Sequence, residues 1–430
     1  MYLADRSAPR GTATAQERVR GTVRAVSPTV FALGAVSLIT DVSTEMVTAV
    51  LPLYLVLGLG LSPLGFGVLD GVQNGVSALV QLTGGHLADR VRNHKLVAGI
   101  GYGLSALCKP LLLVHHMGAL GAALALDRTG KGLRTAPRDA LISLSAPPER
   151  QGRAFGVHRA MDTTGALLGP MLAFLILGVA AGGYDAVFAV SGCVAALGVL
   201  VLLLFVPGGK KQAPEASEAA AAAPVGKADL RAAFGLLRTR RLRVLFGCAV
   251  LLGLTTVSDA FLYLLVQRRT GVAEQLFPLL PLGTATVFLL LALPLGRLAD
   301  RVGRRTVFLA GHAGLLLAYA LLLWAPATPA LPYLVLVLHG AFYAATDGVL
   351  PAAVGAVVPE RLRASGLALV GTGQALARFC CSLAFGAAWA AWGDGPALAA
   401  AAAGLACCAT AAGVALRPTA PALSSSPGEK

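Results

Sequence analysis

Long apolar segments recur along the whole chain, and each is long enough to cross a lipid bilayer, which takes about 20 mostly apolar residues. The 430 residues are 56% apolar and only 13% charged, whereas soluble domains average roughly 45–50% apolar and about 25% charged residues. So little charge cannot cover a soluble protein of this length, and a soluble enzyme is therefore excluded. We predict an all-α membrane protein with twelve transmembrane helices. The predicted segments are 28–56, 63–84, 96–114, 117–144, 153–179, 184–206, 242–267, 273–295, 306–325, 331–357, 364–391 and 395–415.

The basic residues of the connections indicate which side of the membrane each connection faces. Most lie after the second, fourth, eighth and tenth segments and in the polar stretch between the sixth and seventh. Connections rich in Lys and Arg face the cytoplasm, so both termini are predicted to be cytoplasmic, with the protein in the cell (plasma or inner) membrane. This placement accounts for the net charge of +14 without a nucleic acid partner. The predicted organisation is a tail at 1–27, a six-helix bundle at 28–206, a linker at 207–241, a second bundle at 242–415 and a tail at 416–430.

The loop after the second apolar segment recurs after the eighth. The first copy begins at Gly85 and reads GHLADRV, and the second begins at Gly296, 211 residues later, and reads GRLADRV. A second pair of similar stretches begins at Pro148 and Pro359, with the same offset of 211 residues. The chain is therefore predicted to consist of two six-helix halves in the same orientation, as in transporters built from parallel repeats.

The doubled G-x-L-A-D-R loop resembles the loop signature of the major facilitator superfamily, and the resemblance covers about residues 28–415. It implies two pseudo-symmetric bundles around a central cavity, alternating access and a monomer. It also implies a gate at the cytoplasmic side, in which Arg90 or its neighbours pair with Asp139. The alternative is that the loop charges only orient the chain. The residues assigned to the gate are Gly85, Asp89, Arg90 and Asp139 in the first half and Gly296, Asp300, Arg301 and Asp347 in the second.

Four residues of the fifth segment resemble the glycine–proline signature of antiporters in this superfamily. They are Gly156, Gly165, Gly169 and Pro170. Glycines on one strip let a helix pack closely, and proline removes a backbone hydrogen bond, so the helix can bend. In the family this packing seals the cavity against ion leak, which favours export. The final pair of glycines is missing, and a generic glycine-rich interface is the alternative.

Two acids, Asp41 and Glu45, lie in the first segment. Residues four apart share one face of a helix, and acids inside a membrane are costly unless neutral or paired, so they mark ion or proton pathways. We therefore predict that this pair couples transport to protons. The alternative, which does not exclude the first, is a structural pairing with a cation of the fourth segment. Arg128 in that segment, in Arg128-x-x-Lys131-Gly, resembles the arginine–glycine signature of proton-coupled facilitators, where the arginine assists proton transfer.

The fourth segment is the most heavily charged. Its cations at positions 128, 131, 134 and 138 fall within about a third of the helix circumference. Four cations facing lipid would be prohibitive, so the arc must face a cavity, other acids or the cytoplasmic mouth. It could bind an anionic substrate, or it could neutralise acids of other segments. The residues predicted to line the substrate cavity are Lys131, Arg134, Asp162, Asp259 and Arg378.

The sequence contains no HExxH or GxSxG motif and no nucleotide-binding motif, so we expect no enzyme, and the energy for transport should come from an ion gradient. We predict a secondary active transporter that couples the efflux of a small organic molecule to protons. An uptake symporter or a uniporter is the alternative, and a multispan membrane enzyme is a remote one. No cofactor or metal is expected, since the seven cysteines lie in apolar segments without metal-binding spacing. The expected partners are a small-molecule substrate, protons and the lipid bilayer.

Overall fold

The computed structural model describes residues 27–73, 75–76, 80, 93–146, 151–180, 182–207, 235–359 and 363–416. Every regular element among these residues is a helix. Within the same ranges, nine helices are long and apolar enough to cross a membrane. The predicted all-α membrane class is confirmed.

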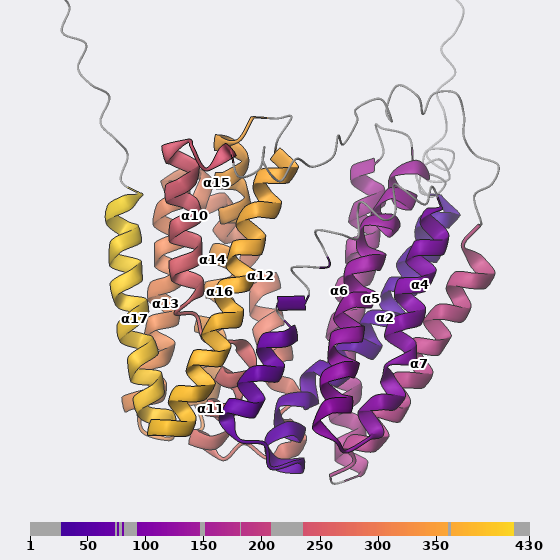
Figure 1. Ribbon diagram of the computed structural model, residues 1–430, viewed down its shortest axis with the longest axis horizontal. Coiled ribbons are helices and arrows are strands. Elements are labelled where there is room, and N and C mark those ends of the chain that lie inside the picture. The colour runs from indigo at the N-terminus through magenta and orange to yellow at the C-terminus, as the bar shows by residue number, and fades with distance from the viewer. Residues whose placement is uncertain are drawn as a thin grey trace, which may run out of the picture.

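The first half of the chain forms one bundle of helices, on the right of Figure 1. Its helices begin and end within two residues of the predicted segments wherever the described residues allow the comparison. The helices are α2 (Pro28–Leu53), continued by η1 (Tyr54–Gly58), a helix described over residues 63–73, α4 (His94–Leu107) with η2 (Lys109–Leu113), α5 (Met117–Leu144), α6 (Gln151–Val179) and α7 (Tyr184–Phe205).

The second half forms the other bundle, and it departs from the prediction in three places. The predicted segments 242–267 and 331–357 are each broken into two helices, and α12 continues beyond residue 295 through the G-x-L-A-D-R stretch, which was predicted to be a loop. Gly303, with a φ of 97°, then ends α12. The helices are α10 (Arg240–Gly253), α11 (Asp259–Thr270), η4 (Glu274–Leu276), α12 (Leu279–Val302), α13 (Arg304–Trp324), α14 (Leu331–Thr346), α15 (Val349–Val357), α16 (Arg363–Trp392) and α17 (Asp394–Ala415).

The same pairs of helices pack together in both halves. Helix α2 packs on α6 in the first half, as α10 packs on α16 in the second. Likewise, α4 contacts α5 and α7, while α13 contacts α14 and α17. Counted in chain order, the two helices of each second-half pair hold the same places in their bundle as the two helices of the matching first-half pair. The packing therefore agrees with a repeated bundle in one orientation.

Small residues set the closest helix contacts of the first half. A Cβ added at Gly101 of α4 would lie 2.7 Å from the carbonyl oxygen of Gly130 of α5, and one added at Gly165 of α6 would overlap the backbone of Leu38 of α2. In lipid, helix association depends on such close packing, because the surrounding hydrocarbon is as apolar as the helices. These contacts fix α5 against α4 and α6 against α2.

The two halves touch at the end predicted to be external, which lies at the bottom of Figure 1. Phe66 packs edge-on against Phe261 with ring centroids 4.7 Å apart. A Cβ added at Gly67 would lie 2.5 Å from the carbonyl oxygen of Ser382 on α16. The Tyr184 hydroxyl also donates a hydrogen bond of 3.1 Å to Glu274. Together these contacts close the space between the halves at this end.

Candidate functional site

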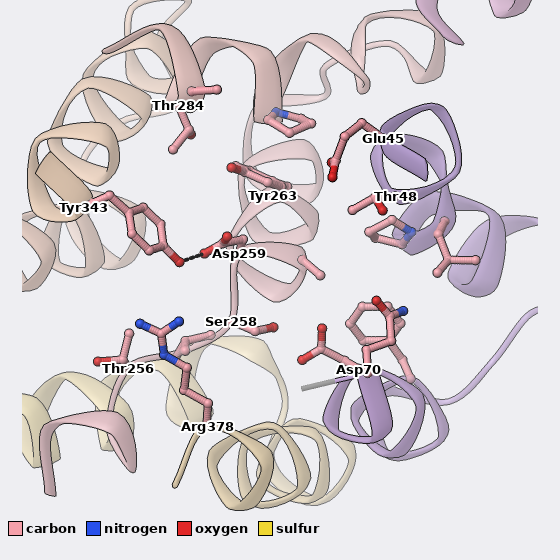
Figure 2. Close-up of a pocket in the computed structure, with 18 of the residues that line it drawn as sticks. Glu45, Thr48, Asp70, Thr256, Ser258, Asp259, Tyr263, Thr284, Tyr343 and Arg378 are labelled. Carbon is pink, nitrogen blue, oxygen red and sulfur yellow. Dashed lines mark hydrogen bonds between the residues drawn. The ribbon is translucent and has the colours of Figure 1, made fainter. Parts of the chain in front are cut away.

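A cavity of about 420 Å³ lies between the two halves (Figure 2). The first half contributes α2, the helix from residue 63 and α5, and the second contributes α11, α12, α14, α16 and the break before α11. Its volume is within the range of small-molecule sites, roughly 300–1,000 Å³. Its polar lining residues are Glu45, Thr48, Asp70, Gln73, Arg128, Thr256, Ser258, Asp259, Tyr263, Thr284, Tyr343, Asp347 and Arg378.

The cavity brings together part of the predicted site. Glu45, Arg128, Asp259 and Arg378 line it, and so does Asp347, which was predicted to belong to the cytoplasmic gate. The remaining predicted cavity residues, Lys131, Arg134 and Asp162, are not part of its lining. Arg134 of α5 is directed at Asp41 and Ser105, and Asp162 of α6 is directed at Ser37 and Arg138, so both side chains make their contacts within the first half.

Asp41 and Glu45, predicted as one coupling pair, lie in different surroundings. Glu45 faces the cavity, whereas Asp41 is buried within the first half, 3.9 Å from a guanidinium nitrogen of Arg134. One helical turn separates the two acids along α2, and the Arg134 side chain of α5 reaches α2 at Asp41. Asp41 therefore has the arrangement of the alternative interpretation, a pairing with a cation of the fourth span.

Arg138 is the centre of an ion-pair network that ties α5 to α2 and α6. Its guanidinium lies 3.0 Å from Asp139 and 3.6 Å from Asp162, and it donates a hydrogen bond of 3.0 Å to the Ser37 hydroxyl. Ser37 in turn donates to Asp162 at 2.8 Å. Among the described residues Asp139 pairs with its own neighbour Arg138, and its predicted pairing with Arg90 stays a prediction. Gly85, Asp89 and Arg90 lie outside the described residues.

The wall of the second half is organised around Asp259. Its Oδ1 accepts a hydrogen bond of 2.6 Å from the Tyr343 hydroxyl and lies 3.2 Å from Nε2 of the buried His339. Figure 2 shows Tyr343 directed at Asp259, with the Arg378 guanidinium beside them. His339 and Tyr343 were not among the predicted site residues. The available signal was their spacing, since His339, Tyr343 and Asp347 are four residues apart in a largely apolar segment.

Asp70 links the halves at the cavity wall near the predicted external end. Its Oδ2 accepts a hydrogen bond of 2.6 Å from the Ser382 hydroxyl of α16, and Figure 2 shows it facing Ser258 as well. Nearby, Arg128 donates a hydrogen bond of 2.9 Å to the side-chain oxygen of Gln73. Asp70 was not among the predicted site residues. Its helix therefore both lines the cavity and holds the closed end together.

The break between α10 and α11 places backbone next to the cavity. Thr256, Val257 and Ser258 line it, and the Val257 amide donates a hydrogen bond of 2.8 Å to the Tyr319 hydroxyl. Non-helical backbone at membrane depth is tolerated only where protein buries it or where it lines a water-filled space. Broken helices of this kind form the substrate sites of many transporters.

The second copy of the loop signature lies away from the cavity. Gly296, Asp300 and Arg301 occupy the last turns of α12. Asp300 is exposed and lies 3.9 Å from Arg304 of the next helix, and a Cβ at Gly296 would meet open space. In this structure Asp300 of the second copy therefore forms a local, solvent-exposed ion pair with Arg304.

The glycine-rich helix packs as its sequence indicates over part of its length. A Cβ at Gly169 would lie 2.7 Å from the Cβ of Glu45, and Gly165 is equally close to α2, whereas Gly156 faces open space. Pro170 lies inside α6. The glycine contacts of α6 with α2 therefore lie at Gly165 and Gly169 and reach the cavity acid Glu45.

Comparisons with known proteins agree with this architecture. The sequence matches the model of the Major Facilitator Superfamily over residues 33–288 and 260–430. It is 30% identical over 376 residues to an uncharacterised MFS-type transporter of Methanocaldococcus jannaschii, covering 85% of this chain and 89% of that protein.

Two solved structures illustrate the similarity in fold. The nucleoside transporter NupG has a TM-score of 0.74 at 15% identity, covering 91% of this chain and 100% of that one. A POT family transporter in complex with 5-aminolevulinic acid has a TM-score of 0.72 at 14% identity, covering 90% and 94%. At such identities the likeness concerns the fold alone.

Proposed function

Because the chain belongs to the Major Facilitator Superfamily, we propose that it exports a small organic molecule in exchange for protons. Its family makes it a multi-pass membrane protein and a secondary transporter, not an enzyme. Proton coupling, direction and substrate are the proposed part. The observation that carries the proposal is the cavity between the halves, which holds an acid without a partner in the described protein.

Glu45 is the acid that exchanges the proton. It lines the cavity from α2, and none of the described residues forms an ion pair or a side-chain hydrogen bond with its carboxylate. A carboxylate inside a membrane is costly unless it takes up a proton or binds a cation. Proton uptake with the cavity open to the outside, and release with it open to the inside, would link each turnover to a proton. Arg128, held by Gln73 beside the same cavity, assists this step.

Asp41 supports the site rather than carrying the exchanged proton. It already has Arg134 as a counter-ion inside the first half, and it does not line the cavity. Arg134 is itself fixed by a hydrogen bond of 2.8 Å to the Ser105 hydroxyl of α4. The pair therefore holds α2 and α5 together one turn away from Glu45.

Export is favoured by the seal between α6 and α2. Gly165 and Gly169 bring the two helices into backbone contact next to Glu45. Such contact leaves no room for water or ions along this side of the cavity. An exchanger needs this seal, because ions that leak past the cavity would dissipate the gradient that drives export.

The cavity suits a small molecule that carries polar groups. Acids and two arginines face it together with aromatic rings, so it can hold charged groups of either sign as well as an apolar part. The structurally similar proteins include a nucleoside transporter and a peptide transporter. Nucleosides, dipeptides and lipophilic cations are therefore the first compounds to test.

Purified protein in liposomes that contain a pH-sensitive dye tests the proposal. Each compound of the panel is supplied while a pH gradient is imposed, and proton movement and compound accumulation are measured together. With Glu45→Gln, gradient-driven accumulation should fall at least about tenfold, because the neutral amide cannot carry the proton. Exchange of labelled for unlabelled compound without a gradient should persist, since it needs no proton transfer.

Asp185→Asn is the matched control. This acid is 59% exposed at the predicted external end and pairs with His115, away from the cavity. Its removal should leave gradient-driven accumulation close to the wild-type rate. Accumulation in the opposite direction would identify the uptake symporter instead, and a final level independent of the gradient would identify the uniporter. Unchanged accumulation with Glu45→Gln would remove this residue from the coupling step.

A further inference from the structure

His339 is a buried histidine that lies one side chain behind the cavity wall. Its side chain is only 1% exposed, yet Asp259, Thr284, Tyr263 and Tyr343, which surround it, all line the cavity. It lies on α14, and its neighbours come from α11, α12 and α14 itself. Histidine is the side chain that ordinarily changes charge between about pH 5 and 8.

We propose that His339 and Asp259 form a second proton-binding site, located in the C-terminal half. The inference rests on the proposed proton-coupled transport. It adds a second proton-binding group to the coupling acid Glu45. In one state the imidazole is neutral and its Nε2–H donates to Asp259. In the other it has gained a proton at Nδ1 and forms an ion pair with the same carboxylate, 3.2 Å away.

The surroundings of the imidazole accept both states. Nδ1 faces the Thr284 hydroxyl at 3.5 Å, and a hydroxyl can either donate to the neutral ring or accept from the charged one. On the other side, Oδ1 of Asp259 keeps its hydrogen bond from Tyr343 in either state. Neither state therefore leaves a ring nitrogen without a partner, which is the condition for reversible protonation in a buried place.

Thr284 also provides the connection to the cavity. The residue is only 5% exposed, but it is part of the cavity lining. A proton can pass from cavity water to the hydroxyl while the hydroxyl gives its own proton to Nδ1. The ring then gains one proton, and the hydroxyl has lost one proton and taken up another. Asp259 is the exposed partner of the pair, with 45% of its side chain accessible.

Protonation of the pair changes the charge that the cavity presents. With His339 neutral, Asp259 contributes one negative charge to the wall, where it acts on Arg378 of α16 and on a bound substrate. With His339 charged, the positive imidazolium on the side of Asp259 away from the cavity neutralises that negative charge. The other titratable groups near the pair are Tyr263 and Tyr343 beside the ring, Asp347 on the same lining, Glu45 across the cavity and His312 behind Phe342.

The first measurement follows the proton itself. Protein with ¹⁵N-labelled histidine is placed in lipid bilayers, and the ring-nitrogen resonances are recorded between pH 5 and 8. Of the resonances from the seven histidines, the one that belongs to His339 should change from the neutral to the charged form as the pH is lowered. The same resonance should be absent in His339→Gln and displaced in Asp259→Asn. If the resonance lost in His339→Gln shows no titration in the wild type, the proposal is wrong.

The second measurement connects the site to transport. In the liposome assay, with the panel compound that moves most protons in the wild type, His339→Gln should lose the steep pH dependence of accumulation while exchange without a gradient persists. His312→Gln is the matched control, because His312 is also buried but bonds to the Phe308 carbonyl of its own helix and does not line the cavity. It should keep the wild-type pH profile.

Thr284→Val keeps the shape of its side chain and removes only the hydroxyl, so it tests the site even where a histidine variant folds poorly. It should shift the pH profile in the same sense as His339→Gln. If the wild type responds to the gradient and both variants keep its pH profile, only the role of His339 is refuted. If the wild type itself does not respond to the gradient, the proposed function fails, and the coupling role of His339 fails with it.

Discussion

Buried charges in the first half are paired across helices, and the pair Lys109–Asp127 is the most enclosed of them. The Lys109 ammonium lies 3.3 Å from Asp127, and their side chains are 2% and 10% exposed. Lys109 begins η2 just after α4, and Asp127 lies on α5, so the pair joins two neighbouring spans. Taking both charges out of water is expensive, and each therefore depends on the other to be tolerated.

Removing one partner of this pair should cost more than removing both. Lys109→Met leaves Asp127 buried without its nearest counter-ion, which should lower the free energy of unfolding by about 3–5 kcal/mol. The double variant Lys109→Met with Asp127→Leu should recover most of the loss, because apolar residues of similar volume replace buried ion pairs well. Thermal unfolding of the purified proteins in detergent measures both effects. A double variant no more stable than the single one would show that the charges are not coupled.

Single residues also show how far the sequence could predict the site. Glu45, Arg128, Asp259 and Arg378 are recognisable because a charge inside an apolar segment stands out by itself. Their orientation is not recognisable, since it depends on how each helix is rotated against its neighbours. Lys131, Arg134 and Asp162 stand out in the same way, yet they are not part of the lining of this cavity. His339 was missed because it carries no formal charge, although its only described acidic partner, Asp259, was predicted.

Among the helices, the breaks in the seventh and tenth spans were the features that hydropathy could not show. A short non-helical stretch does not change the average over a segment of this length, so 242–267 and 331–357 were predicted as continuous. The run from Thr255 to Ser258, just before Asp259, is typical of a helix start and was the available local signal. Where the structure describes their ends, the first-half spans were predicted to within two residues.

The contact between the helix over residues 63–73 and α16 yields a prediction about the closed end. Gly67→Leu places side-chain atoms where a Cβ alone would already lie 2.5 Å from the Ser382 carbonyl oxygen. The two helices must then separate, which should favour opening at the predicted external end. Spin labels at positions 62 and 394, in a variant without native cysteines, would report this as a shift to longer distances.

Gly371→Leu is the control for this change, because it adds the same side chain to α16 where a Cβ meets no atom within 4 Å. The distance distribution should stay as in the unsubstituted protein. Equal distributions for Gly67→Leu and the control would mean that the glycine contact does not hold this end closed. The comparison separates the effect of the contact from the effect of a larger residue on the helix surface.

For the molecule as a whole, the repeat was the feature that made the fold predictable. Two similar loops 211 residues apart indicated two bundles in one orientation, and the helix pairs of the two halves correspond as expected. The cavity between them could be predicted only through the family resemblance, because no local pattern says which helices face each other across the halves. The tails and most of the linker lie outside the described residues, and their boundaries stay predictions.

The orientation of the molecule in the membrane can be argued from the basic residues that the structure leaves at each end. The end where α10 begins and α12 ends carries many arginines, including Arg240, Arg241 and Arg301, all exposed. At the opposite end Arg268 lies 3.3 Å from Asp394, and Arg269 donates to the Ala325 carbonyl, so both bind the protein itself. The arginine-rich end should therefore face the cytoplasm.

Fusions made in a bacterial host test this orientation. A fluorescent protein that folds only in the cytoplasm should be bright when fused after residue 416 and dark when inserted after Gly271. Alkaline phosphatase, which is active only outside the cytoplasm, should give the reverse result at both positions. An active phosphatase after residue 416 would show that the molecule has the opposite orientation in the membrane. The closed end described above would then face the cytoplasm, and the exchange proposed here would have to start from the opposite state.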